Sequence, residues 1–249
     1  MARSRSPGAQ RVGPLVAAPR RVRRALSIAM GDHAMIGMRM PGQEWPGAAA
    51  SFLGAWVVMM AAMMLPVLVP ALRRYRRAVG QVGAARAAGV VAYVGAGYFT
   101  VWAVLGLAVF PLGAMRAIVE RELPALAAAA PIAAGVVVVI AGALQFTAWK
   151  AHHLACCRAM PGHGGNVPAD LGAAWRHGVR LGLHCTCSCA GATAVLFTTG
   201  FMDPRLMAVV AGAITLERLA PRGERVAAAI GVVVIGAGVA LIVRTALPG

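Results

Sequence analysis

Charged residues are scarce in this sequence, and acidic ones are the scarcest. Only 13% of the 249 residues are charged, with 8 Asp and Glu against 24 Lys and Arg, whereas 59% are hydrophobic. A soluble protein with so much apolar side chain would need far more polar surface to cover it. Several apolar runs approach or exceed the ~18 residues that make a spanning helix plausible. The sequence therefore predicts an all-α fold, a polytopic integral membrane helical bundle.

Cysteines are also few, and they lack the pattern of an extracellular disulfide framework. The five of them are an odd number and fall into two clusters. No P-loop, phosphorylation motif or nucleotide site is evident, so we expect a function that needs no nucleotide hydrolysis. We expect no signal peptide either, because no adequate apolar run follows the basic residues 1–24.

We predict about six transmembrane helices in a domain over 45–249, preceded by a basic and methionine-rich segment over 1–44. The expected spans are about 48–72, 88–112, 125–148, 178–201, 204–219 and 226–244. Pro66 and Pro70 should kink or locally break the first span. The formal net charge is +16. Its arginines lie between apolar runs and not in one patch, so we expect membrane lipid and no nucleic acid as a partner.

Basic residues also set the expected orientation. The loops over 72–88, 149–180 and 218–225 carry twelve Lys and Arg, while the opposite side carries four. The positive-inside rule makes the richer side cytoplasmic, so we predict a multi-pass protein of the inner (cytoplasmic) membrane. Six spans then put the basic N-terminal segment outside, against its charge. Either a first helix has been lost, or the start is wrong, or the tail is exported.

The sequence "HCTCSC" at 184–189 places three thiols and an imidazole inside the fourth span. On a helix, Cys185 and Cys189 share one face, while Cys187 points away from them and His184 faces a serine. Thiols packed as small hydrophobes are one interpretation. We favour a soft-metal site, because Cu(I) prefers thiolate and thioether ligands and Zn(II) also accepts thiolate with imidazole.

A second cluster, "KAHHLACCRAMPGH" at 150–163, follows the third span. If the helix continues, it holds two i,i+4 pairs of imidazole and thiol, which would suit a metal. The two pairs are His152–Cys156 and His153–Cys157. The alternative is an interfacial segment in which Lys150 and Arg158 meet lipid headgroups.

Methionines form two neighbouring columns in "MMAAMML" at 59–65, namely Met59/Met63 and Met60/Met64. Thioethers are neutral soft ligands, although such a stripe also suits core or lipid-facing packing. At ~1.5 Å per residue, Met64 and Cys185 lie at similar depth in the cytoplasmic half. Glu217 ends the fifth span there, as a functional acid or as the ion-pair partner of Arg218 or another arginine. A further methionine-dense stretch at 30–42 resembles a flexible Cu(I)-capturing segment.

At these motifs the chain resembles the bacterial family of predicted metal-binding integral membrane proteins, over roughly 45–244. The resemblance rests on "WVVMMAAMMLPVLVP", "WKAHHLACCRAMP", "HGVRLGLHCTCSCAG" and "GFMDPRLMAVVAGAITLERLAPRG". The family pattern falls here on Trp56, Met59, Met63, Met64, Pro66, Lys150, Cys157, Arg158, Gly182, Cys185, Cys189, Met202 and Glu217. The resemblance implies a membrane protein that binds metal.

The chain departs from that family pattern at several positions. His153 replaces a cysteine, which keeps a metal ligand, and Arg218 replaces a lysine. Cys156, Cys187 and His184 are additional, and the first helix of the family is missing. Its loss would explain why six spans put a basic N-terminal segment outside.

The sequence favours a protein that binds and transfers or transports a soft metal ion, Cu(I) before Zn(II), over an enzyme. Partners would be a metal donor or acceptor protein or a membrane complex. The alternatives are a thiol oxidoreductase using the three thiols of "HCTCSC", a metalloenzyme with a His/Cys/Glu site, and a structural subunit of a larger complex. Thiols on one rigid helix close a disulfide poorly, which counts against the oxidoreductase.

Overall fold

The computed structural model describes residues 44–79, 83–159, 170–199 and 204–247, and every regular element in these ranges is a helix. The helices are α2 (Trp45–Ala78), α3 (Ala84–Glu122), α4 (Pro124–Leu144), α5 (Ala148–Arg158), α6 (Leu171–Thr199), α7 (Pro204–Leu219) and α8 (Gly223–Ala246). The predicted all-α fold is therefore confirmed over these ranges. The basic and methionine-rich segment predicted before residue 44 lies outside them.

Four helices, α2, α3, α6 and α8, are long and apolar enough to cross a membrane. Helices α4 and α5 pass the same test only as a pair, bent by 63°, which raises the number of candidate spans to 5. Helix α7 has 16 residues, which is short for a crossing of the ~30 Å hydrocarbon layer. The described residues thus support four or five spans by length and composition, where the sequence analysis expects six.

The break between α4 and α5 is produced by Thr147. Its hydroxyl donates to the carbonyl oxygen of Leu144 at 2.7 Å and accepts the backbone N–H of Lys150 at 3.2 Å. The same side chain therefore bonds the end of α4 and caps the beginning of α5, the ordinary role of a threonine at a helix N-terminus. The third span does not continue straight into the histidines and cysteines of α5, as a single helix would.

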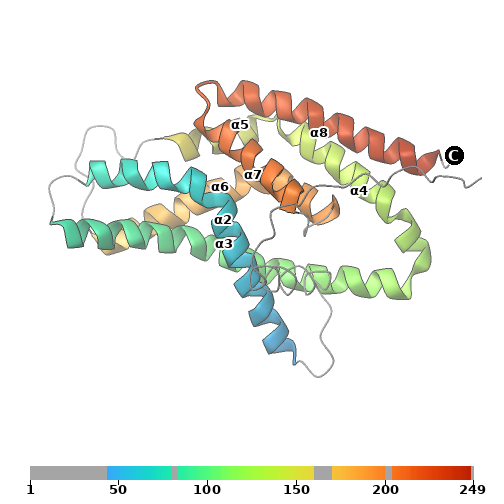
Figure 1. Ribbon diagram of the computed structural model, residues 1–249, viewed down its shortest axis with the longest axis horizontal. Coiled ribbons are helices and arrows are strands. Elements are labelled where there is room, and N and C mark those ends of the chain that lie inside the picture. The colour runs from blue at the N-terminus through green and yellow to red at the C-terminus, as the bar shows by residue number, and fades with distance from the viewer. Residues whose placement is uncertain (1–43, 80–82, 160–169, 200–203, 248–249) are drawn as a thin grey trace, which may run out of the picture. The chain divides into compact units, whose positions relative to one another are not determined.

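Small residues allow two pairs of helices to pack closely, as is common between membrane helices. A Cβ atom on Gly97 of α3 would lie 2.5 Å from the carbonyl oxygen of Trp175 in α6. A Cβ atom on Gly142 of α4 would lie 3.0 Å from the carbonyl oxygen of Gly231 in α8. Figure 1 shows α4 and α8 running alongside each other, and α2 changing direction along its length. Helix α2 contains Pro66 and Pro70, which give a physical reason for that bend.

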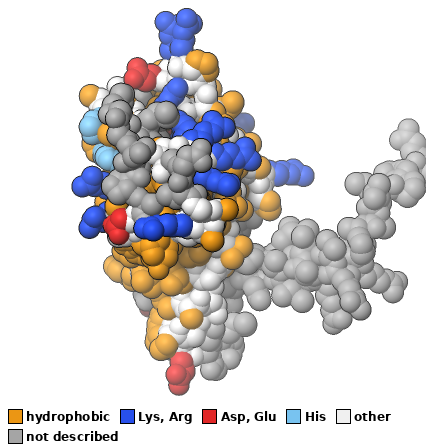
Figure 2. Space-filling model, turned by 90° about the vertical axis from the view of Figure 1, so that its left-hand side faces the viewer, with side chains coloured by type: hydrophobic (Ala, Val, Ile, Leu, Met, Phe, Trp, Pro, Cys, Tyr) orange, Lys and Arg blue, Asp and Glu red, His pale blue; other side chains and the backbone are white. Residues whose placement is uncertain are grey.

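The main apolar core lies where α2, α3, α5, α6 and α7 meet. Trp56 of α2 is buried there, with its indole N–H donating to the carbonyl oxygen of Trp102 at 2.8 Å. Exposed arginines lie at the end of α2 and in the first turns of α3 and α6, namely Arg73, Arg76, Arg77, Arg86, Arg176 and Arg180. Figure 2, which looks onto this side, shows Lys and Arg side chains gathered above an expanse of hydrophobic ones.

Contacts also join the three segments that the sequence predicts on the basic side. Arg158 at the end of α5 donates to the carbonyl oxygens of Ala220 and Pro221, at 2.6 and 3.3 Å. Arg74 near the end of α2 donates to the carbonyl oxygen of Arg158 at 3.4 Å. Loops far apart in the sequence therefore come together at one end of the bundle.

Candidate metal site

Two thiols of α6 lie deep in the core on one face of the helix. Cys185 is 0% exposed and Cys189 is 2% exposed, and their i,i+4 spacing puts them one above the other. Helix α6 comes close to α3 because Gly182 faces it: a Cβ atom there would lie 3.0 Å from the carbonyl oxygen of Tyr98. This approach lets the Tyr98 hydroxyl reach the Sγ atom of Cys185 at 2.9 Å.

The methionine stripe of α2 belongs to the same core as these thiols. Three of its four members are buried: Met60, Met63 and Met64. The thiol of Cys185 lies 3.9 Å from the Sδ atom of Met64, whereas Met59 is only partly buried and packs against the cluster from outside. The structure therefore brings together two segments that the sequence analysis placed at similar depth.

Helix α5 adds a third thiol to this core. Cys157 is buried in the same cluster. We call the sulfur-bearing members of the cluster the sulfur core; they are Met60, Met63, Met64, Cys157, Cys185 and Cys189. A small pocket of about 10 Å³, room for roughly one water molecule, lies beside it and is lined by Cys157, Tyr98, Arg158 and Arg218 among others.

A buried ion pair lies next to the sulfur core. The Nζ atom of Lys150 is 2.7 Å from the Oε2 atom of Glu217 and donates to the carbonyl oxygen of Ser188 at 2.6 Å. The other carboxylate oxygen of Glu217 accepts from the Gln145 amide at 3.1 Å. Glu217 thus pairs with Lys150 and not with an arginine, and Lys150 is too deeply buried to meet lipid headgroups.

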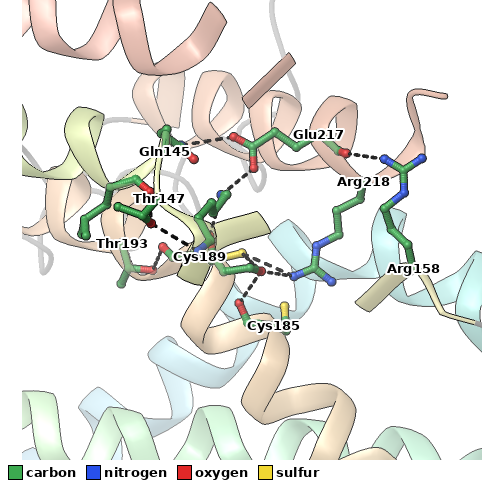
Figure 3. A network of polar contacts seen from close by, with 11 residues as sticks. Gln145, Thr147, Arg158, Cys185, Cys189, Thr193, Glu217 and Arg218 are labelled. Carbon is green, nitrogen blue, oxygen red and sulfur yellow. Dashed lines mark hydrogen bonds and ion pairs between the residues drawn. The ribbon is translucent and has the colours of Figure 1, made fainter. Parts of the chain in front are cut away.

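Arg218 follows Glu217 in the chain but reaches a different set of partners. Its Nη2 atom donates to the Ser188 hydroxyl at 2.6 Å and to the Sγ atom of Cys189 at 3.7 Å. Figure 3 shows the Glu217 carboxylate pointing toward Gln145 and the Arg218 guanidinium pointing toward Cys189. Arginine keeps its proton in proteins even when it is buried. Arg218 therefore remains a cation beside the thiols.

Arg158 holds the end of α7 that carries both of these residues. Its guanidinium donates to the carbonyl oxygens of Glu217, Ala220 and Pro221. A cation at the C-terminus of a helix satisfies carbonyls that have no partner within the helix. Arg158 thus fixes α7 against α5 and acts on the site through the backbone.

Three histidines of α5 and α6 form a separate group with Cys156. The Nδ1 atoms of His153 and His184 are 2.9 Å apart, and the ring centroid of His152 lies 5.3 Å from that of His153. His152 also contacts Cys156, with 3.6 Å between Nε2 and Sγ. We call these four residues the histidine group. Its members are exposed or partly exposed, so it is distinct from the sulfur core, although His184 and Cys185 are neighbours in the chain.

Three candidate sulfur ligands belong to neither set, namely Met59, Cys187 and Met202. Cys187 is partly buried and stands on another face of α6 from Cys185 and Cys189. Met202 lies outside the described residues. Across the described ranges, no three His, Cys, Asp or Glu side chains are placed to hold one metal ion. A metal site built from this chain's described residues must therefore include methionine or bind the ion with only two of those residues.

The sequence pattern does not reveal Tyr98 or Ser188 as site residues, and it presents Arg218 as a partner for a carboxylate or as the replacement of a family lysine. Tyr98 sits on α3, a helix with no metal-ligand pattern, so no local signal connects it with Cys185. Ser188 enters the sequence pattern only as the residue one helical turn after His184. A weak signal existed for Arg218, because a cation next to an intramembrane acid is uncommon.

Residues 53–241 match the family model PpoB2, described as a copper chaperone. No curated protein and no solved structure matches the chain. Because the matched residues cover well over half of the sequence and include the sulfur core, the histidine group and the buried charges, this chain belongs to the copper chaperone family PpoB2.

Proposed function

We propose that this chain is a membrane protein that binds Cu(I) through the sulfurs of Cys185, Cys189 and Met64 and passes it to a partner protein. The observation that carries the proposal is the 3.9 Å approach of the Cys185 and Met64 sulfurs inside a buried core. A second thiol follows one helical turn later. Membership of a copper chaperone family indicates copper as the metal, and thiolate and thioether ligands favour its monovalent form.

The ligand set favours Cu(I) over Zn(II). Zinc in proteins takes four ligands from cysteine, histidine and carboxylate in structural sites, and three in catalytic ones. No such group of three exists among residues 44–79, 83–159, 170–199 and 204–247. Two thiols and a thioether suit a soft monovalent ion of low coordination number.

The arrangement also suggests a route by which the ion is exchanged. Cys157 lines the small pocket beside the sulfur core, so it is a thiol that an incoming or outgoing ion can meet first. The histidine group lies farther out and is partly exposed, as a docking point for a donor or acceptor protein requires. Stepwise replacement of one sulfur ligand by the next needs no hydrolysis of a nucleotide.

The membrane setting of this function follows from the sequence and the helices together. Four or five helices suit a membrane, and the resemblance to bacterial metal-binding membrane proteins agrees with that setting. On this proposal the basic loops face the cytoplasm, these helices cross the inner membrane, and the exchange takes place in the cytoplasmic half of the bundle.

Metal analysis of the purified protein tests the proposal. The full chain, reduced and reconstituted in lipid nanodiscs, is loaded with Cu(I) in the presence of a chromogenic Cu(I) chelator, and bound copper is measured by mass spectrometry. We expect about one tightly held ion, lost in Cys185→Ser/Cys189→Ser. Cys187→Ser is the matched control, because it removes a thiol from the same helix but another face. Equal copper in all three proteins would contradict the proposal.

A further inference from the structure

Arg218 is a buried cation whose charge no carboxylate balances in the described part of the chain. Its side chain is nearly inaccessible, and its guanidinium contacts a hydroxyl and a thiol. The nearest acid along the chain, Glu217, gives its carboxylate to Lys150 and Gln145. Lys150 and Glu217 neutralise each other, which leaves the positive charge of Arg218 beside Cys189.

An uncompensated guanidinium is expensive to bury, and arginine cannot escape that cost by losing its proton. The geometry indicates what balances it. The Sγ atom of Cys189 lies 3.7 Å from Nη2, and Ser188 holds the guanidinium in that direction at 2.6 Å. The negative charge that Arg218 needs must therefore come from the sulfur site itself.

We propose that Arg218 selects the ion held by Cys185, Cys189 and Met64 by its charge, admitting monovalent soft cations and disfavouring divalent ones. This inference rests on the proposed function of those sulfurs. Two thiolates and one monovalent ion carry a single negative charge, which Arg218 neutralises. Two thiolates and one divalent ion carry no charge, and Arg218 is then left unbalanced in a buried place. Cu(I) and Ag(I) fit this requirement, whereas Zn(II) and Cd(II) do not.

The position of Arg218 is fixed by more than its own contacts. Arg158 holds the carbonyl oxygens at the end of α7, and Gly223 leaves room for this approach, because a Cβ atom there would collide with the Arg158 guanidinium. The cation is thus held in place by the fold and does not depend on a bound ion to order it. That makes Arg218 a positioning residue whose effect falls on ion choice.

Competition between Ag(I) and Cd(II) tests the inference, since both ions seek thiolates and neither changes oxidation state. The full chain in nanodiscs is titrated with each ion, and the ratio of the two dissociation constants is compared among variants. Arg218→Met should shift this ratio toward Cd(II) by at least tenfold, and Arg218→Lys, which keeps the charge, should retain most of the preference for Ag(I). Arg180→Met, which removes an exposed cation from α6, is the control and should leave the ratio unchanged.

The outcomes separate this inference from the proposed function. If the unmodified protein binds neither Ag(I) nor Cu(I), the sulfur site itself is refuted. If it binds Ag(I) but Arg218→Met has the same ratio, the charge argument alone is wrong. If Arg218→Met does not fold, Ser188→Ala provides the test, because it releases the guanidinium from its anchor and should shift the ratio in the same direction by a smaller factor; no shift would overturn the inference.

Discussion

The Sγ atom of Cys185 and the Sδ atom of Met64 lie 3.9 Å apart although 121 positions separate them in the sequence. They come from α6 and α2, and both side chains are buried. Sulfur atoms this close need only a small movement to bind one ion. Most of the conformational entropy of these side chains is therefore lost when the helices pack, and not when an ion binds. If these sulfurs hold Cu(I) as proposed, the fold organises the site before the metal arrives.

Replacing Met64 tests the thioether directly. Met64→Leu keeps nearly the same volume, and such exchanges usually cost less than about 1.5 kcal/mol of stability. If the thioether is a ligand, the affinity for Cu(I) should fall about tenfold or more, the equivalent of ~1.4 kcal/mol, as measured by competition with a chromogenic chelator. Met59→Leu is the matched control, since Met59 lies at the edge of the sulfur core. The same loss in both variants would remove Met64 from the ligand set.

The sequence predicts the helices better than the breaks and turns between them. Apolar runs locate the helices, because length and hydropathy decide the span. The bounds of α7 match the predicted 204–219, whereas α3 ends at Glu122 and not near the predicted 112. The separate helix α5 was not predicted, although Thr147 is a residue type that caps helices. The structure shows that the chain turns at Thr147, and only this turn makes the residue a cap.

At the candidate metal site, too, local spacing predicts some residues and packing between helices adds the others. Spacing alone puts Cys185 and Cys189 on one face of a helix, and it puts Met63 and Met64 on a helix that ends on the same side. It does not reveal Tyr98, because the approach of α3 to α6 depends on glycines facing a backbone far away in the sequence. It also does not reveal that Lys150 and not an arginine pairs with Glu217. Both are consequences of packing between helices that no local pattern encodes.

Tyr98→Phe removes the hydroxyl that lies 2.9 Å from the Cys185 sulfur. A hydrogen bond of this kind contributes ~0.5–1.5 kcal/mol, and a donor to a metal-bound thiolate stabilises the loaded state. We expect the affinity for Cu(I) to fall about two- to tenfold while the helix content seen by circular dichroism stays the same. Tyr93→Phe, on the exposed face of α3, should bind copper as the unmodified protein does. An unchanged affinity in Tyr98→Phe would mean that the Tyr98 hydroxyl does not stabilise a metal-bound thiolate at Cys185.

Gly178→Ala tests whether the contact between α3 and α6 builds the site. A Cβ atom at this position would collide with the backbone of Val94, which cannot rotate away as a side chain could. The helices must separate, at a cost of about 1–3 kcal/mol, and Tyr98 must move away from Cys185. The unfolding temperature in detergent and the affinity for Cu(I) should both decrease. Gly95→Ala is the control on α3, because no atom lies within 4 Å of a Cβ there and alanine favours a helix more than glycine does.

The ion pair of Lys150 and Glu217 should be structural, and a double-mutant cycle can establish this. Either Lys150→Met or Glu217→Leu leaves one buried charge without its partner, which typically costs about 3–5 kcal/mol. The double variant removes both charges, so it should cost much less than the sum of the single changes. Denaturation in mixed micelles measures the three free energies of unfolding.

The same variants separate folding from metal binding. Neither Lys150 nor Glu217 belongs to the sulfur core, so the double variant should still hold about one Cu(I) per chain, whereas each single variant should lose copper only in proportion to its unfolded fraction. Glu224→Gln removes an exposed acid from the first turn of α8 and should change stability by less than ~0.5 kcal/mol. Strictly additive costs of the single changes would show that the pair is not coupled. Loss of copper from a folded double variant would instead make Glu217 or Lys150 part of the metal site.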